Sequence, residues 1–303
     1  MLSNDVTILV NSCDAYADCW EPFFKLWKAY WPDSSCKLIL NTESKAFQMD
    51  GLDITCLQLY KPGEKIPYGE RMIAHLQHIQ TPYVLTMMDD FFLRAPVDMT
   101  KVAQCLSWLK SDPLAAQFYF TQCVDDWNIP AKSYPGFIQK DHICPYKCNM
   151  MPGIWKKEVL EQYWVPEASP WEWEYYCTFR TFLTPHKFYA LSQQTPLFMD
   201  IGNRRGKPWG VVRGKWVLED VQPLFQAHNI EVDYAHMGIY PYEEMIVETP
   251  SIAKAHLKQL IGSKNFRKLN SFTLKKRIFG LLHIPFESDF ISYLRKKQKT
   301  NDR

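Results

Sequence analysis

Short, continuously apolar runs alternate with amphipathic segments through the first 122 residues of the chain. Such runs are typical of strands buried on both faces of a parallel sheet, and amphipathic segments between them are typical of helices. Strands that alternate with helices predict βαβ crossovers, and therefore an α/β fold with a mostly parallel sheet flanked by helices. The expected strands are 6–10, 37–40, 54–59, 83–88 and 117–121, and the expected helices are 16–30, 68–80 and 98–110.

The pattern becomes less regular after about residue 122, where Pro, Trp and Tyr are frequent. A helix is expected from about Ile154, a second over roughly 171–183, and a strand over about 187–191. The chain is therefore expected to contain one large domain with a regular and a less regular half, followed by a basic extension. The expected boundaries are 1–262 for the domain, 1–122 and 123–262 for its halves, and 263–303 for the extension.

Two adjacent carboxylates follow the apolar run at 83–88. This run leads directly into Asp89 and Asp90. Open α/β sheets bind ligands in the crevice beyond the carboxyl ends of their strands. Hard oxygen ligands suit Mg²⁺ or Mn²⁺, and such an ion suits a diphosphate. The sequence therefore predicts a nucleotide-sugar site with Asp90 and Asp89 as metal ligands; a helix or turn cap after the strand is the competing explanation.

The order of these features resembles that of GT-A-fold glycosyltransferases, particularly those that build bacterial lipopolysaccharide or capsule. It comprises a first strand with a polar tip at 11–14, an arginine-bearing helix at 68–80, and an apolar strand ending in Asp-Asp. In that fold the carboxylate motif, often Asp-x-Asp, holds a metal on the diphosphate of a nucleotide sugar. The spacing here departs from Asp-x-Asp, which leaves open which carboxylate contacts the metal. The resemblance implies that 1–122 binds the donor and that 123–262 faces the acceptor.

Four residues are candidates for binding the nucleotide. Near the end of the first expected strand, Asp14 can accept hydrogen bonds from a base or ribose, Tyr16 can stack on the base, and Ser12 lies beside them. Arg71 can reach the nucleotide or the diphosphate, and it matches the basic residue that often lies near the nucleotide in the resembling family. The structural alternatives are an N-cap for Asp14 and a solvent-facing helical position for Arg71.

An acidic, tryptophan-rich segment at 167–174 is the candidate acceptor region. Inverting glycosyl transfer needs a carboxylate base, and an acid among tryptophans has a raised pKa and stacking surfaces beside it. Glu174 is narrowly favoured over Glu172, because acids two apart on a helix face different directions. The structural alternative is that these acids lie in the first turn of a helix, where the helix dipole stabilises negative charge. The tryptophans expected to stack on the acceptor, unless they belong to the core, are Trp155, Trp171 and Trp173.

The segment 202–216 carries five cations, four glycines and no acid. A flexible basic loop beside an anionic substrate is typical of a lid that closes over a diphosphate. A solvated charged loop and a patch for lipid phosphates are the alternatives. The expected lid residues are Arg204, Arg205, Lys207, Arg213 and Lys215.

The net charge of +2 hides an asymmetry between the body and the C-terminal extension. From Lys264 to Arg303, eleven Lys and Arg face three acids, a net charge of +8, which leaves −6 for the first 263 residues. Segment 272–297 mixes basic clusters with Phe, Leu and Ile, which favours an amphipathic helix on anionic lipid; a solvated helical extension is the structural alternative. Such docking would suit a lipid-linked glycan acceptor. Because the rest of the chain is acidic and carries no known binding motif, no nucleic-acid partner is expected.

The remaining composition favours a cytoplasmic enzyme, peripheral on the inner face of the membrane. The nine cysteines are scattered through core-like segments, as expected for reduced thiols. The first ten residues lack the basic region of a signal peptide, and no apolar run approaches the ~18 residues of a membrane span. Neither a GxGxxG nor a GxxxxGK[ST] motif occurs, which argues against a dinucleotide fingerprint or a P-loop.

The function expected is a glycosyltransferase that moves a sugar from a nucleotide-diphosphate donor to a hydroxyl of a bacterial surface glycan. Two alternatives stay open. A nucleotidyltransferase would use the same strand-tip aspartates, although residues 11–14 lack the glycine-rich, basic loop that such enzymes usually have. A non-catalytic carbohydrate-binding protein would explain the eleven tryptophans and would need neither nucleotide nor metal.

Overall fold

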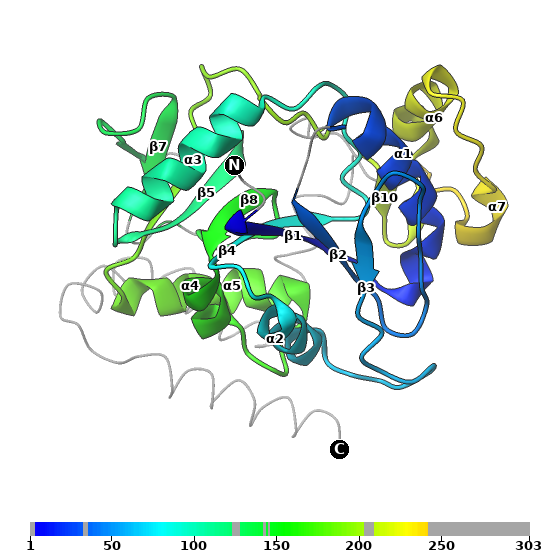
Figure 1. Ribbon diagram of the computed structural model, residues 1–303, viewed down its shortest axis with the longest axis horizontal. Helices are drawn as coiled ribbons and strands as arrows, with labels where there is room; N and C mark the ends of the chain where they lie inside the picture. The colour runs from blue at the N-terminus through cyan, green and yellow to red at the C-terminus, as the bar shows by residue number, and fades with distance from the viewer. Residues whose placement is uncertain are drawn as a thin grey trace, which may run out of the picture.

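The computed structural model is built around one nine-stranded sheet (Figure 1), in the order β3-β2-β1-β4-β8-β5-β9-β7-β6. It describes residues 4–32, 36–122, 128–141, 144, 146–202 and 209–241. The strands are β1 Val6–Asn11, β2 Lys37–Asn41, β3 Ile54–Cys56, β4 Tyr83–Met88, β5 Ala115–Gln122, β6 Asn128–Pro130, β7 Phe137–Lys140, β8 Gly153–Lys156 and β9 Lys187–Leu191. A separate hairpin pairs β10 Val211–Val212 with β11 Lys215–Trp216.

Seven of the nine strands run in one direction. β3, β2, β1 and β4 are mutually parallel, and β5 is parallel to β9. β8 runs antiparallel between β4 and β5, and β7 runs antiparallel beside β9. The mostly parallel α/β sheet predicted from the sequence is therefore confirmed.

Helices cover both faces of the sheet (Figure 1). α2, α4 and α5 lie below it in this view and α3 lies above, while α6 and α7 lie beside α1. The helices are α1 Trp20–Tyr30, α2 Tyr68–His78, α3 Met99–Ser111, α4 Lys157–Tyr163, α5 Pro170–Arg180, α6 Leu218–Ala227 and α7 Tyr234–Met237, with 3-10 turns η2 Asp14–Cys19 and η3 Thr181–Leu183. Among the described residues, no helix is long and apolar enough to cross a membrane.

The central strands contribute side chains to two hydrophobic cores, one on each face of the sheet. In β1, Ile8 and Val10 pack with α1 and α3, whereas Leu9 between them packs with α2, α4 and α5. Both faces are covered, so successive side chains are buried although they point in opposite directions. This explains why the strands appear in the sequence as continuous apolar runs.

The sequence prediction was wrong for the start of the helix at 154. Residues 153–156 form β8, and α4 begins only at Lys157. Ile154 packs into the α1–α3 core and Trp155 into the opposite one, which is the two-residue period of a strand. Four residues are too few to reveal that period without knowledge of the two cores.

The chain changes direction between β1 and β4. From β1 it proceeds outward to β2 and β3, and then returns to place β4 on the other side of β1. This is a topological switch point, and open α/β sheets bind ligands at such a point, beyond the carboxyl ends of the strands.

Candidate functional site

The two adjacent aspartates lie at the switch point. Asn11 ends β1 and pairs in register with Met88, which ends β4. The Asp89 N–H donates to the Asn11 carbonyl at 3.1 Å, so the first residue beyond β4 is tied to the end of β1. The structure therefore confirms that Asp89 and Asp90 directly follow the carboxyl end of β4.

A hydrogen-bond chain from Trp20 through Ser12 holds the Asp89 side chain. The Ser12 hydroxyl donates to Asp89 Oδ2, and the indole Nε1 of Trp20 donates to the same hydroxyl at 2.6 Å. Asp89 is 1% exposed. Burial first, and then the neighbouring Asp90, raise the pKa of Asp89 well above its usual range, although the hydrogen bonds of Ser12 and Trp20 oppose this shift. Ser12 therefore orients a carboxylate.

Asp90 is only partly buried, but its Oδ1 atom is buried and has no hydrogen-bond partner among the described residues. Burial raises the pKa of Asp90 to about 7. A buried carboxylate oxygen without a donor costs free energy, and a cation that it could bind would remove this cost. The pair therefore has the donor chemistry and the unsatisfied atom expected of a divalent-ion site.

Asp14 joins the loops that follow β1 and β2. Its carboxylate accepts backbone hydrogen bonds from Glu43, Ser44 and Lys45 at 3.1–3.2 Å, and the Ser44 hydroxyl at 2.6 Å. Burial raises the pKa of Asp14, but these hydrogen bonds outweigh it and lower the pKa overall. Asp14 does not cap the following helix, whose N-cap is Cys13. With its oxygens engaged in this way, Asp14 fixes the loop after β1 to the loop after β2.

Arg71 points into the protein rather than into solvent, since it is 7% exposed. Its guanidinium lies 2.9 Å from the Glu43 carboxylate and 5.3 Å from the centre of the Tyr68 ring. Arg71 Nε has no hydrogen-bond partner among the described residues. α2 starts at Tyr68 and runs antiparallel to the strand that follows it, so Arg71 lies near the carboxyl edge of the sheet. The solvent-facing alternative is therefore wrong.

Tyr16 lies on η2, beside the aspartates. Burial, followed by the charges of Asp90 and Asp89, raises the pKa of Tyr16 to about 12. Burial above all, with smaller contributions from the same two carboxylates, also raises the pKa of the Tyr68 hydroxyl. Two phenols thus share the acidic environment of the switch point and remain neutral hydrogen-bond donors at physiological pH.

No family model and no curated protein matches this sequence. Among solved structures, S. aureus TarS in complex with UDP-GlcNAc is 12% identical, with a TM-score of 0.45 and coverage of 80% of this chain and 71% of that one. Mannosyltransferase PcManGT from Pyrobaculum calidifontis, in complex with GDP-Man and Mn²⁺, is 13% identical, with a TM-score of 0.43 and coverage of 67% and 59%. A CMP:2-keto-3-deoxy-manno-octonic acid synthetase complexed with CTP is 10% identical, with a TM-score of 0.37 and coverage of 74% and 97%.

The present chain spans less than two thirds of some of these proteins, namely 59% of one TarS structure and 41% of a longer one. With TM-scores below 0.5, these likenesses assign no family to this chain.

Glu174 on α5 is a partly buried acid below the sheet. Its Oε1 accepts the Met150 N–H at 2.8 Å. Burial raises the pKa of Glu174 to about 7, against lowering by that N–H and by Lys140. Met150 precedes β8, whose first residue Gly153 pairs with Thr86 near the end of β4. No hydrogen bond or ion pair between described residues joins Glu174 to the two aspartates.

Glu172 has a structural task. Its Oε2 accepts the Ser169 N–H at 2.9 Å and the Ser169 hydroxyl at 2.8 Å, while the Ser169 hydroxyl accepts the Glu172 N–H. This is a capping box at the start of α5. The sequence preference for Glu174 over Glu172 as the free acid is consistent with this division of roles.

Replacing Glu174 with Gln is expected to stabilise the fold in alkaline but not in acidic solution. The pKa of about 7 in the folded state lies above the ordinary glutamate pKa of 4.5, so Glu174 costs stability as pH rises through this interval. The Gln variant should therefore gain up to about 3 kcal/mol in unfolding free energy at pH 8 and little at pH 4.5. Urea denaturation at the two pH values measures the difference.

Glu172→Gln is the matched control, because Gln retains the capping geometry and should shift stability by a similar small amount at both pH values. An equal effect of Glu174→Gln at pH 4.5 and pH 8 would contradict the assignment.

The three tryptophans predicted to stack on an acceptor differ in position. Trp155 and Trp173 are 1% and 2% exposed and pack in the core, where Trp173 stacks on Trp164 at 4.4 Å. Neither presents a ring face to a ligand. Trp171 is 77% exposed at the start of α5. Stacking on an acceptor therefore stays a prediction for Trp171 alone.

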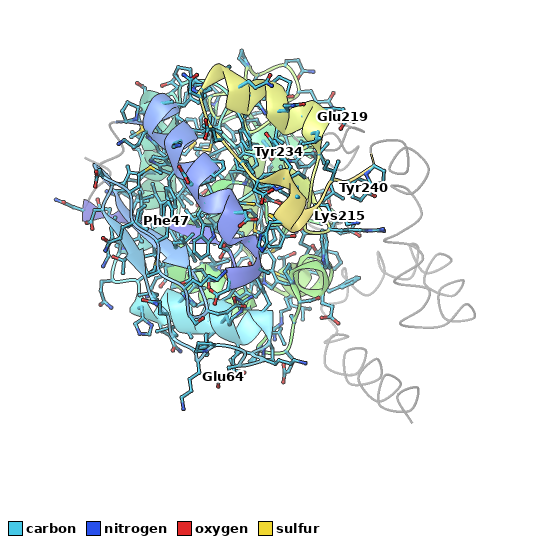
Figure 2. The ribbon with its side chains drawn as sticks, turned by 90° about the vertical axis from the view of Figure 1, so that its right-hand side faces the viewer. Phe47, Glu64, Lys215, Glu219, Tyr234 and Tyr240 are labelled. Atoms are coloured by element: carbon cyan, nitrogen blue, oxygen red, sulfur yellow. The ribbon has the colours of Figure 1, made fainter. Side chains whose placement is uncertain are left out.

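The predicted basic lid is only partly described. Arg204, Arg205 and Lys207 lie outside the described residues. Arg213 and Lys215 are exposed on the β10–β11 hairpin, and Figure 2 shows Lys215 on the outer surface of the molecule.

The segments that flank 203–208 are anchored beside Asp90. A Cβ on Gly210 would stand 2.5 Å from the Asp90 carbonyl oxygen. Asp220 of α6 accepts the Gly210 N–H at 2.7 Å and pairs with Arg94 at 2.5 Å. A Cβ on Gly202 would overlap the Arg94 guanidinium. The two ends of this basic segment therefore meet the chain just after the aspartates.

Sequence reasoning missed Glu43, Tyr68 and the Arg94–Asp220 pair. Glu43 had a signal, because it follows the polar tip of the second strand and parallel strands end at one edge. The Arg94–Asp220 pair had none, since 126 residues separate its members.

Proposed function

We propose that the protein is a GT-A-type glycosyltransferase that uses a nucleotide-diphosphate sugar. The observation that carries this proposal is the position of Asp89 and Asp90 at the switch point of the sheet, with Asp90 Oδ1 buried and unsatisfied. A crevice at this position accommodates a nucleotide, and adjacent carboxylates at the strand end suit the cation that accompanies a diphosphate.

Asp90, together with Asp89, would hold Mg²⁺ or Mn²⁺. The two carboxylates suit such an ion, because Mg²⁺ typically binds through one or two carboxylates, with waters and substrate phosphates completing its coordination. The described residues contain no group of three or more His, Cys, Asp and Glu side chains that could hold a metal ion. When bound, the ion would neutralise charge on the departing nucleoside diphosphate.

The protein groups around the aspartates would bind and orient the donor. Ser12 orients Asp89. Asp14 would hold the loops after β1 and β2 together beside the donor, Tyr16 would offer a neutral phenol and a ring for the base, and Arg71 would offer a buried positive charge to the diphosphate. Arg71 already has Glu43 as partner, so Glu43 would fix the guanidinium in place before the donor arrives.

Glu174 is the base we propose, with Glu172 capping its helix. A carboxyl whose pKa lies near 7 is suited to accept the proton of an acceptor hydroxyl at neutral pH. Transfer would then invert the anomeric centre, as the hydroxyl attacks the face opposite the diphosphate. Trp171 would contact the acceptor sugar.

The remaining assignments come from the sequence. The lid of Arg204, Arg205, Lys207, Arg213 and Lys215 would close over the diphosphate. A surface glycan or its lipid-linked precursor, of lipopolysaccharide or capsule type, is the acceptor we propose. The basic segment 272–297, which lies outside the described residues, would dock on an anionic membrane surface from the cytoplasmic side.

A thermal-shift screen of the protein against UDP, GDP, CDP and dTDP, each with and without Mn²⁺, tests the proposal. One nucleotide is expected to raise the melting temperature only when Mn²⁺ is present, since its diphosphate completes the metal site. Mn²⁺ alone and each nucleotide with EDTA are the controls. Absence of any metal-dependent response would contradict the proposal.

The corresponding sugar donor then distinguishes the two transferase chemistries. A glycosyltransferase releases the nucleoside diphosphate when an acceptor is supplied. A nucleotidyltransferase instead joins a nucleoside triphosphate to a sugar phosphate and releases pyrophosphate. Chromatography of the nucleotide products decides between them.

A further inference from the structure

The hydrogen-bond chain that ends on Asp89 begins in the hydrophobic core. Trp20 is the first residue of α1 and is 2% exposed, and Ser12, which follows β1, is 5% exposed. Both hydrogen bonds of the chain, from Trp20 to Ser12 and from Ser12 to Asp89, are therefore shielded from water. A core residue that contacts neither the ion nor the donor is thus connected to one of the two carboxylates.

Trp20 sets the direction of this chain. An indole N–H can only donate, whereas a serine hydroxyl has one hydrogen to donate and two lone pairs that accept. The Trp20 N–H holds one lone pair of Ser12 at 2.6 Å, so the hydroxyl hydrogen must turn to another acceptor. Asp89 Oδ2 lies in close contact, while the competing acceptor, the Cys13 carbonyl, lies at 3.3 Å. The Ser12 hydrogen is therefore directed to the carboxylate.

Aromatic packing fixes the Trp20 ring. The ring meets that of Phe47 edge-on, with 6.0 Å between centroids, and Phe47 stacks on Phe24 of α1 at 5.4 Å. Phe47 belongs to the loop between β2 and β3, which also supplies Glu43 to Arg71. Because the indole is already held by its neighbours, the hydrogen bond to Ser12 is formed before any ligand binds.

We propose that Trp20 is a positioning residue for the divalent-ion site. It acts through Ser12, which holds Asp89 Oδ2 and so fixes the rotation of the carboxylate before the ion arrives. Groups that hydrogen-bond to metal ligands orient them, and their loss typically lowers metal affinity by about 10–100-fold. This inference rests on the proposed function, since it assumes that Asp89 and Asp90 bind a divalent ion.

The first test removes the indole N–H and keeps the ring. Benzothienylalanine has the shape of tryptophan with sulfur in place of the N–H group, so at position 20 it removes the donor and retains the packing on Phe47. The full chain is titrated with Mn²⁺ alone, and the electron paramagnetic resonance signal of the free ion gives the affinity. We expect a loss of about tenfold for this variant, and a similar loss for Ser12→Ala.

Benzothienylalanine at position 31 is the matched control. Trp31 is 1% exposed, and its N–H donates to Met99 Sδ, so the same replacement again removes a buried hydrogen bond of an indole. Trp31 follows the last residue of α1, whereas Trp20 is its first, which separates them by about 16 Å along the helix axis. This variant should keep the Mn²⁺ affinity of the unmodified chain.

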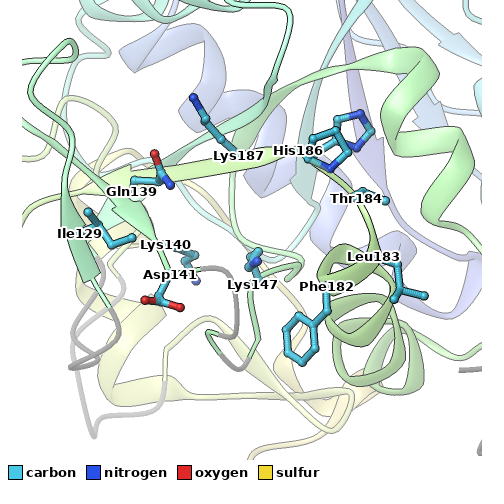
Figure 3. Close-up of a pocket in the computed structure, with 11 residues that line it drawn as sticks. Ile129, Gln139, Lys140, Asp141, Lys147, Phe182, Leu183, Thr184, His186 and Lys187 are labelled. Carbon is cyan, nitrogen blue, oxygen red and sulfur yellow. The ribbon is translucent and has the colours of Figure 1, made fainter. Parts of the chain in front are cut away.

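Two acids show where the Mn²⁺ binds. A pocket of about 480 Å³ contains Asp141 in its lining, beside the start of β9 (Figure 3). Since β9 is parallel to β5, and β4 and β5 both pair antiparallel with β8, this pocket lies at the amino edge of the sheet, opposite the aspartates. Asp141→Asn should therefore leave the Mn²⁺ affinity unchanged, whereas Asp90→Asn should abolish binding.

A second measurement uses the unmodified chain. Mg²⁺ should shift the indole N–H resonance of Trp20 in the nuclear magnetic resonance spectrum, because an ion that draws on Asp89 alters the polarisation of the hydrogen bonds behind it. The indole resonance of Trp31 should not move. Each resonance is identified as the one that the matching benzothienylalanine variant lacks. A tryptophan that only fills space in the core would not respond to the ion.

The outcomes separate this inference from the proposed function. Equal Mn²⁺ affinity of the position-20 variant and the unmodified chain would overturn the role of Trp20 and leave the proposed function standing, as would a Trp20 resonance that saturating Mg²⁺ does not move. Reduced affinity in that variant, with no response to any nucleotide in the thermal-shift screen, would support the role of Trp20 and contradict the proposed function. A chain that binds neither ion would overturn both.

Discussion

Exchanging Asp90 for Asn is expected to reduce the affinity for a nucleotide with Mn²⁺ by about 10²-fold or more, and to abolish sugar transfer. Even ligands of the outer shell typically contribute 10–100-fold to metal affinity, and Asp90 is proposed to contact the ion directly. Asn keeps the size of the side chain but removes the negative charge that binds the cation. Titration calorimetry with the nucleotide that the screen identifies, at saturating Mn²⁺, measures the effect.

The same substitution should leave the fold intact and make it slightly more stable without metal. Asp90 has a buried, unsatisfied oxygen and an acidic neighbour in Asp89, so removing its charge relieves a cost of about 1 kcal/mol or more. Asp50→Asn, an exposed acid, is the control and should change neither property. If the variant loses both affinity and stability, Asp90 has a structural role. If the variant retains transfer activity, the assignment of Asp90 as a metal ligand is wrong.

Gly210→Ala is expected to damage donor binding without touching a ligand-binding side chain. Its φ of +62° already disfavours any side chain, at a cost of roughly 1–2 kcal/mol. In addition, the new Cβ would stand 2.5 Å from the Asp90 carbonyl, so either the segment at 210 or the backbone of Asp90 must move. We expect at least a tenfold loss of nucleotide affinity, measured in the same titration.

Gly214→Ala provides a close control. Gly214 has a φ of +73° in the same hairpin, but a Cβ there would meet nothing within 4 Å. It should lose a similar amount of stability from the backbone conformation and leave nucleotide affinity unchanged. Equal affinity losses in the two variants would show that strain in the hairpin matters rather than contact with Asp90.

The sequence predicted the fold of residues 1–122 well because each element there carries its own signal. β4, for example, appeared as an apolar run that ends in two acids, and both its bounds and its carboxyl-edge position are confirmed. β8 carried no such signal. Its four residues depend on pairing with β4 and β5, contacts that no local period reveals.

Individual site residues were harder to interpret because their surroundings come from distant segments. Arg71 has a solvent-facing default on any amphipathic helix, and only the loop after β2, which supplies Glu43, explains why it is buried. Trp155 and Trp173 were predicted to contact a ligand but are buried in the core. An aromatic side chain suits a sugar-binding surface and a core equally well, so only its burial in the structure distinguishes the two roles.

The late arrival of β8 in the chain affects how the protein folds during synthesis. Until residues 153–156 leave the ribosome, β4 and β5 each have an unpaired inner edge, and the two parts of the sheet cannot join. The β1–β4 pairing already spans more than seventy residues, from Val6 to Tyr83, and closing the sheet requires a second contact across roughly seventy residues, from β4 to β8. A nascent chain stalled before residue 153 would therefore expose an apolar strand edge next to two carboxylates, and this interval is the one in which a chaperone would be most needed.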